Sequence, residues 1–206
     1  MPTVIGDFEH NLAHALSARA PRRSEATEGR AAAVLIPVLD DAEPALLLTL
    51  RTETVSTHKG QISFPGGSLE PGEGPEKAAL REAHEEIGLD PSQVRVLGQL
   101  DQTPTFVSGY VITPVVGWVP AQPFQPNPSE VAALIVAPIA GLTEEIRVEP
   151  GFVHEGFNYP TEAWIYEGHI IWGVTARLLR MFLGLLAGAG LASAPGETES
   201  PWPVSQ

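Results

Sequence analysis

Glu82, Glu85 and Glu86 stand in the middle of the chain, with Glu85 and Glu86 three and four residues after Glu82. On an α-helix this spacing places all three carboxylates on one face, a turn apart. Such neighbours repel: two unit charges ~4 Å apart cost about 4 kcal/mol at an effective dielectric near 20. A divalent cation turns the repulsion into attraction, and Mg²⁺ or Mn²⁺ accepts hard oxygen ligands completed by water and phosphate. Arg81, four residues before Glu85, can pair with it and keep it ionised.

The run that contains these glutamates is more specific than a charged helix face. On its own, a glutamate-rich face is more often simply solvated. The complete run from Gly67 to Leu89, however, reads G-x5-E-x7-R-E-U-x-E-E-x-G-U, where U is an apolar residue. It matches the Nudix box of the MutT/Nudix hydrolases at every specified position, so the chain resembles that superfamily.

The resemblance implies an α+β Nudix fold, in which a mixed β-sheet lies between helices and the box forms a loop–helix–loop. It also implies hydrolysis of a nucleoside diphosphate linked to another group, with Mg²⁺ or Mn²⁺ as cofactor. Arg81 would orient the helix and loop at the catalytic centre. The implied metal ligands are Glu82, Glu85, Glu86 and the backbone carbonyl of Gly67.

The resemblance leaves the general base open. Glu85 and Glu86 are candidates inside the box. Glu130, in the run Asn127-Pro-Ser-Glu-Val131, stands where many Nudix enzymes place an acidic residue before a strand that faces the metal. It is a candidate for the base or for a further metal ligand.

The residues before the box resemble the extra signature of the coenzyme A pyrophosphatase branch, LLTxRSxxLRxHxGxxxFPGG. Thr52 replaces its serine, and Val55-Ser56 replaces its Leu-Arg, so one arginine is missing and Lys59 is a nearby positive charge. Arginine can grip a phosphate through two parallel hydrogen bonds, and lysine can act as a point charge. The candidate substrate-binding residues are Arg51, His58, Lys59 and Gly66.

The surrounding elements must position these residues. The spacing of Phe8, Leu12 and Leu16 predicts an amphipathic helix, followed by a linker up to residue 30. The clearest helix spans 75–87, between Pro75 and Gly88. A last helix is predicted for 170–191, and a disordered tail for 193–206. Strands are predicted at 31–39, 45–52, 94–100, 110–119 and 130–139, with a hairpin of 146–153 and 162–166. The Nudix domain would span 31–192.

Composition limits the partners. The 206 residues include 25 acidic and 12 basic side chains, a formal net charge of −13, which argues against a nucleic-acid surface. The absence of cysteine excludes disulfides and thiol nucleophiles. No secretory signal is visible, and the apolar run 181–192 is too short to cross a bilayer, so we expect a cytoplasmic protein that does not bind membranes. The oligomeric state stays open, a homodimer included.

Two other functions remain as alternatives to coenzyme A hydrolysis. One is a Nudix hydrolase acting on another dinucleotide such as ADP-ribose or NADH. The other is an inactive Nudix domain that serves as a ligand sensor. The intact set of repelling carboxylates argues against the second alternative.

Overall fold

The computed structural model describes residues 4–25, 29–52, 60–105, 109–144, 147–149, 152–154, 157–159 and 163–193. His58, Lys59 and most of the predicted tail lie outside these residues. The helices are α1 (Val4–Ser17), α2 (Pro75–Ile87), α3 (Ile139–Glu144) and α4 (Gly173–Gly188), with a 3-10 helix η1 at Pro91–Gln93.

A mixed sheet occupies the centre of the described structure. Its eight strands are β1 (Arg30–Leu39), β2 (Ala45–Arg51), β3 (Ile62–Ser63), β4 (Gly66–Ser68), β5 (Arg95–Gln99), β6 (Thr103–Pro104), β7 (Tyr110–Val119) and β8 (Val131–Pro138). The main order is β3-β2-β1-β7-β5, and β4, β6 and β8 pair with β1, β7 and β2. Strands β1 and β7 are parallel, and the other pairs of this sheet are antiparallel. The five long strands confirm the predicted ones, whereas the short strands β3, β4 and β6 were not predicted.

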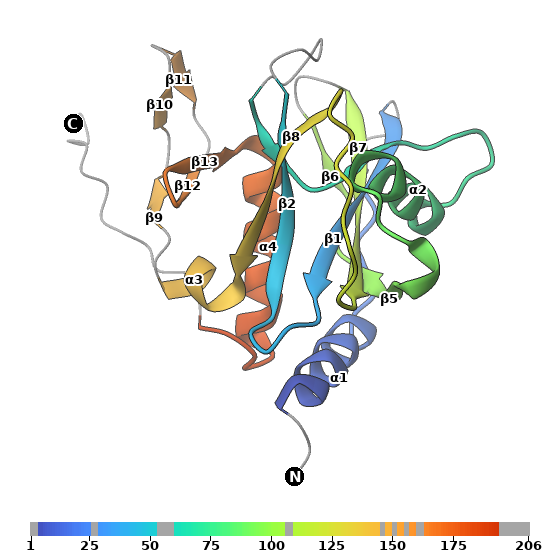
Figure 1. Cartoon of the computed structure of the whole chain (residues 1–206), viewed down its shortest axis with the longest axis vertical. Helices are drawn as coiled ribbons and strands as arrows, with labels where there is room; N and C mark the ends of the chain where they lie inside the picture. The colour runs from blue at the N-terminus through green and yellow to red at the C-terminus, as the bar shows by residue number, and fades with distance from the viewer. Residues whose placement is uncertain are drawn as a thin grey trace.

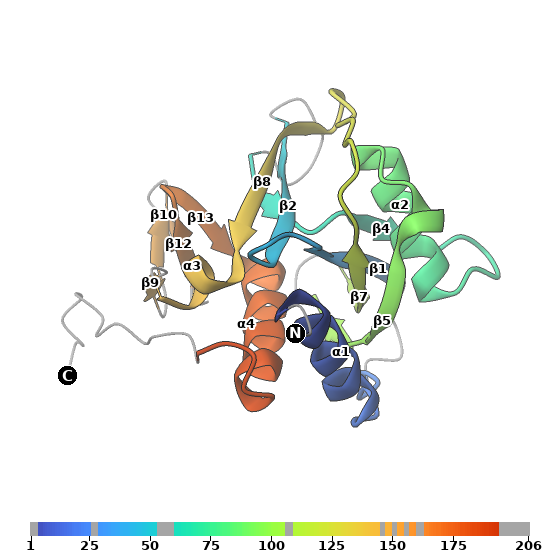
Figure 2. The same cartoon turned by 60° about the horizontal axis from the view of Figure 1, so that its bottom comes forward.

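Both faces of the sheet are buried. Successive side chains of a strand point to opposite faces, so the apolar run of β1 supplies two cores. Ile36 packs in a core with residues of α1 and α4, and its neighbour Leu35 packs in a second core with residues of α2. Figure 1 shows α2 and α4 on opposite sides of the sheet, and Figure 2 shows α1 beside α4. The predicted mixed sheet between helices is therefore confirmed.

Helix α2 begins and ends where the sequence predicts. Pro75 stands in the first turn, where its missing N–H removes no helical hydrogen bond. Gly88 ends the helix with a φ of 67°, a left-handed conformation that glycine adopts without strain, and its N–H donates to the His84 carbonyl. The buried side of the helix consists of Ala78, Ala79, Ala83, Glu86 and Ile87. The short alanines let α2 lie close to the sheet, and Glu86 is carried into this interface.

The N-terminal helix forms as predicted, with Leu12 and Leu16 buried. The polar stretch after it was predicted as a linker, but its first part is tied to the sheet. The buried carboxylate of Asp101 accepts the Arg22 backbone N–H at 2.9 Å and the Arg22 Nε at 3.0 Å, and it also pairs with Arg19. Three donors on one carboxylate fix the path of the chain between α1 and β1.

The C-terminal helix is shorter than predicted, so the expectation of a helix from 170 to 191 is wrong at its start. Residues His169–Trp172 form β13, which pairs antiparallel with β12 (Ala163–Tyr166). The isoleucines and tryptophan of this segment favour a strand, and Gly173, the first residue of α4, has a φ of 66° where the chain turns from the strand into the helix. The apolar side chains of α4, among them Leu179, Phe182 and Leu183, are buried in the core. None of the described helices is long and apolar enough to cross a membrane.

The predicted hairpin before α4 is confirmed in part. Strand β9 (Arg147–Glu149) pairs antiparallel with β12, as expected. Phe152 and Val153, predicted to continue β9, instead belong to β10 (Phe152–His154), which pairs with β11 (Phe157–Tyr159). A separate small hairpin therefore lies between the two predicted partners.

Candidate active site

The three box carboxylates project from the C-terminal half of α2 into different surroundings. The side chain of Glu86 is 5% exposed, that of Glu82 is 19% exposed, and that of Glu85 is 56% exposed. His84, between them, is exposed, and its Nδ1 lies 2.8 Å from the Leu89 carbonyl, beyond the helix end. The carboxylates thus form a series from the protein interior to the solvent.

Arg81 connects these carboxylates to the preceding loop. Its Nε and Nη2 donate to the two carboxylate oxygens of Glu73, each at 3.1 Å, and Nη2 also donates to the Ser68 carbonyl at 3.0 Å. Its Nη1 donates to Glu82 at 2.9 Å and to Glu85 at 3.3 Å, so the predicted Arg81–Glu85 pair is present. The bonds from Arg81 hold the pKa of Glu73 below its usual value. A two-pronged guanidinium contact of this kind sets geometry as well as charge.

Strand β4 approaches α2 at Gly67, where no side chain would fit. A Cβ placed on Gly67 would lie 2.5 Å from the carboxylate carbon of Glu82. Gly66 is equally confined, since its Cβ would lie 2.4 Å from the carbonyl oxygen of Ala33 in β1. Gly67 therefore brings the backbone of β4 directly against the Glu82 carboxylate, and Gly66 lets the same strand lie close to β1.

Glu86 lies beside Arg51, the last residue of β2. Arg51 Nη1 is 3.6 Å from Glu86 Oε1, while Glu86 Oε2 and Arg51 Nε are buried without a hydrogen-bond partner among the described residues. Burial raises the pKa of Glu86 to about 7, although Arg51 and a hydrogen bond from the Gly66 backbone oppose the shift. The charges of Glu130 and Glu82 add to it.

Glu130 belongs to the same group of charges. Burial raises the pKa of Glu82, Arg81 opposes this, and the charges of Glu85 and Glu130 raise it further. The Glu130 carbonyl accepts the Thr52 N–H at 2.9 Å, which fastens Glu130 next to the end of β2. The structure thus brings the four predicted carboxylates together from α2 and from the turn before β8.

Backbone hydrogen bonds hold the loop that leads to Glu130. The N–H of Gln125 donates to the Ile87 carbonyl, and the N–H of Asn127 donates to the Glu86 carbonyl, both at 2.8 Å. The Asn127 side chain then accepts the N–H of Ser129 at 3.1 Å and its hydroxyl at 2.7 Å. This tie between the end of α2 and the loop is not visible in the sequence, because any residue other than proline can supply a backbone donor.

The carboxylates fit a divalent cation by their chemistry, although the described part of the chain contains no ready group of three acidic or histidine side chains around one point. The carboxylates stay apart because like charges at this spacing repel, and because Arg81 and Arg51 hold them in separate ion pairs. The buried Glu86 Oε2, which has no donor among the described residues, and the close approach of the Gly67 backbone to the Glu82 carboxylate both suit an oxygen-liganded ion.

A Gly67→Ala substitution tests the importance of this close approach. The added methyl group would strike the Glu82 carboxylate, so we expect Mn²⁺ to bind about tenfold more weakly while the protein stays folded. Gly74→Ala is the matched control, because Gly74 has a φ of −85° and open space where the Cβ would be. Mn²⁺ titration followed by electron paramagnetic resonance measures both. Equal affinities of the two variants would contradict the role given to Gly67.

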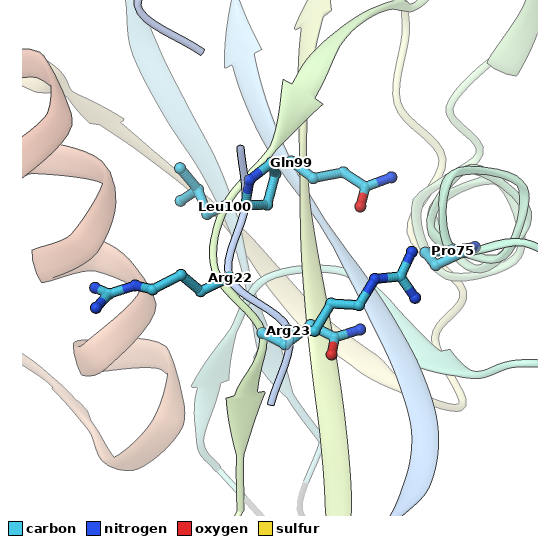
Figure 3. A pocket seen from close by; sticks show the side chains of 7 residues that line it. Arg22, Arg23, Pro75, Gln99 and Leu100 are labelled. Carbon is cyan, nitrogen blue, oxygen red and sulfur yellow. The ribbon is translucent and has the colours of Figure 1, made fainter. Parts of the chain in front are cut away.

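A separate cleft of about 230 Å³ lies at the other end of α2 (Figure 3). Arg22 and Arg23 line it together with Pro75, Gln99 and Leu100. In Figure 3 the Arg23 side chain extends towards Pro75, whereas Arg22 points away from it. The cleft contains none of the predicted site residues, since the box carboxylates lie in the opposite half of α2.

Of the predicted substrate contacts, Arg51 and Gly66 lie beside Glu86.

Comparison with known proteins agrees with this arrangement. A family model described as a NUDIX domain matches residues 29–156. Two proteins named uncharacterized Nudix hydrolase NudL, from Yersinia pestis (strain Pestoides F) and Yersinia pseudotuberculosis serotype O:1b (strain IP 31758), are each 43% identical over 154 residues, covering 73% of this chain and 77% of theirs.

A solved structure shows the same fold. The crystal structure of a MutT/nudix family protein from Enterococcus faecalis has a TM-score of 0.51 and 12% identity, covering 91% of this chain and 76% of that one. Nudix hydrolases generally need divalent cations such as Mg²⁺ or Mn²⁺. The chain belongs to the Nudix hydrolase family, and it is a pyrophosphohydrolase that acts on a nucleoside diphosphate derivative.

Proposed function

We propose that this enzyme hydrolyses the diphosphate of coenzyme A, and of its thioesters, to 3′,5′-ADP and 4′-phosphopantetheine. The observation that carries the proposal is the position of Arg51, the arginine of the coenzyme A-type signature. It lies 3.6 Å from Glu86, the buried carboxylate of the box, and its Nε donates to no group among the described residues. A guanidinium beside a carboxylate that would hold the metal suits a substrate whose diphosphate binds both the arginine and the metal ion.

In this proposal, Mg²⁺ or Mn²⁺ is held by Glu82, Glu85 and Glu86, with the Gly67 carbonyl as a backbone ligand. The ion, when bound, polarises the phosphoryl oxygens and lowers the pKa of water. Arg81 keeps Glu82 and Glu85 in place through the bonds described above. Catalysis is then mainly a matter of position and charge.

The chain also supplies groups for the water and for the substrate. Glu130 stands on a separate turn from Glu82 and Glu86, where it can accept a proton from the attacking water or add a further ligand. Glu85, the most exposed of the box carboxylates, is the other candidate for the base. Arg51 and the Gly66 backbone would contact the phosphates, and His58 and Lys59 would add to them.

A substrate panel tests the proposal. Coenzyme A, ADP-ribose and NADH are each incubated with enzyme and Mn²⁺ in ¹⁸O-labelled water, and the products are identified by mass spectrometry. We expect coenzyme A to be cleaved at least about tenfold faster than the other two, a selectivity that a few specific contacts can provide. The product that carries ¹⁸O identifies the attacked phosphorus.

The remaining outcomes decide between the alternatives. Rapid cleavage of ADP-ribose or NADH, with coenzyme A left intact, would assign the enzyme to a different dinucleotide. Binding of a panel member without any turnover at saturating Mn²⁺ would indicate a ligand sensor instead. A Glu86→Gln sample processed in parallel accounts for contaminating hydrolases.

A further inference from the structure

Arg51 and Glu86 form a buried ion pair that is only partly satisfied. Their side chains are 23% and 5% exposed, and the Nη1–Oε1 distance of 3.6 Å exceeds the 2.9 Å at which Arg81 binds Glu82. Charge-assisted hydrogen bonds are usually about 2.7–2.9 Å long. Each partner also has a buried polar atom without a hydrogen bond to the described residues. The attraction is therefore electrostatic, and no hydrogen bond between the two groups is lost when they separate.

Two arginines pair with the carboxylates of the site, and each pairs with different ones. The ion pairs of Arg81 are with Glu73, Glu82 and Glu85. Among the ion pairs of the described residues, Arg51 is the partner of Glu86. An uncompensated charge at so buried a position would be costly. Arg51 is thus the counter-ion of Glu86 in the protein without metal.

A divalent cation bound to Glu86 would replace Arg51 as its counter-ion. It would bring two positive charges to the carboxylate, and it would repel a guanidinium only a few ångströms away. The Arg51 Nε, which has no hydrogen-bond partner among the described residues, and Nη1, which lies 3.6 Å from Glu86 Oε1, would then bind an anion more favourably than they bind Glu86. The end of β2 is fixed by its pairing with β8, so only the side chain has to move.

We propose that Arg51 is the counter-ion of Glu86 while the metal is absent, and that metal binding releases the Arg51 side chain towards a substrate phosphate. The inference rests on the metal site of the proposed function. It makes binding ordered, with metal before substrate, because the phosphate-binding arginine becomes available only once Glu86 has another counter-ion. It also means that Arg51 weakens metal binding in the absence of substrate.

The test is Mn²⁺ affinity without substrate, measured by electron paramagnetic resonance under argon at about pH 9, where carboxyl groups are ionised. We expect Arg51→Met to bind Mn²⁺ about fivefold more tightly than the wild type, since a repelling charge is gone. Arg51→Lys keeps the charge and should stay close to wild type. Arg95→Met is the matched control, because Arg95 is 60% exposed and pairs with Glu9 on α1.

A second measurement separates this role from simple substrate binding. Thermal unfolding of metal-free Arg51→Met should occur at a lower temperature than that of Arg95→Met, and saturating Mn²⁺ should restore more of the stability. Equal Mn²⁺ affinity of Arg51→Met and Arg95→Met, or weaker binding by Arg51→Met, would overturn the inference. If Arg51→Met does not fold, Arg51→Gln takes its place, and a wild-type Mn²⁺ affinity of that variant would overturn the inference equally. Failure of the wild type itself to bind Mn²⁺ would instead remove the proposed metal site.

Discussion

Replacing Glu86 by glutamine is expected to lower kcat by about a thousandfold while the protein remains folded. Glutamine keeps the shape and one side-chain oxygen, so the buried position next to Arg51 is still filled. It removes the negative charge that would bind the cation, and it replaces one carboxylate oxygen by an amide N–H₂ that cannot act as a metal ligand. The loss should appear in kcat at saturating substrate and metal, with coenzyme A as substrate.

Glu76→Gln is the control for this substitution. It makes the same chemical change on the same helix, but Glu76 is exposed in the first turn of α2, where its carboxylate accepts a hydrogen bond from Gln99. We expect its kcat to stay within about twofold of wild type, as for most surface substitutions. Near-normal turnover in a well-folded Glu86→Gln protein would contradict the assignment of Glu86 as a metal ligand.

The same substitution should change how stability depends on pH in the metal-free protein. The pKa of Glu86 is raised from 4.5 to about 7, chiefly by burial. Between these values the folded state holds a proton that the unfolded chain has released, so stability falls as pH rises. The shift corresponds to roughly 3 kcal/mol, fully lost once the pH exceeds about 7. Glutamine has no such titration.

Urea unfolding in the presence of a chelator, at a series of pH values, measures this difference. Below about pH 4.5 the two proteins should have similar free energies of unfolding, since Glu86 is then neutral in both states. Between about pH 4.5 and 7 the curves should diverge, and above that range Glu86→Gln should be the more stable protein. Parallel curves throughout would show that the carboxylate is well solvated, contrary to its position in the structure.

The sequence predicts well those features that depend on neighbouring residues. Helix α2 is confirmed at both ends, because Pro75 and Gly88 act through their own backbone geometry. The Arg81–Glu85 pair is likewise a matter of helical spacing. The long strands follow from apolar runs that are buried on both faces of one sheet.

Features that depend on distant parts of the chain were not predictable in the same way. The apolar run that begins at Ile170 fits a buried helix or a buried strand equally well, and pairing with β12 decides for the strand up to Trp172. The contact of Arg51 with Glu86 requires the end of β2 to lie beside the end of α2, which no local pattern specifies. The predicted roles of His58 and Lys59 stay predictions.

The loop before Glu130 has a consequence for how this enzyme can diverge. Pro123, Pro126 and Pro128 alternate with Gln125 and Asn127, whose amide hydrogens tie the loop to the end of α2. The positions of the prolines relative to these two donors are therefore fixed in descendants of this enzyme. Shifting the prolines by a single position would put an imino acid where an amide is required, and the acidic residue downstream would lose its anchorage although every letter of the Nudix box were intact.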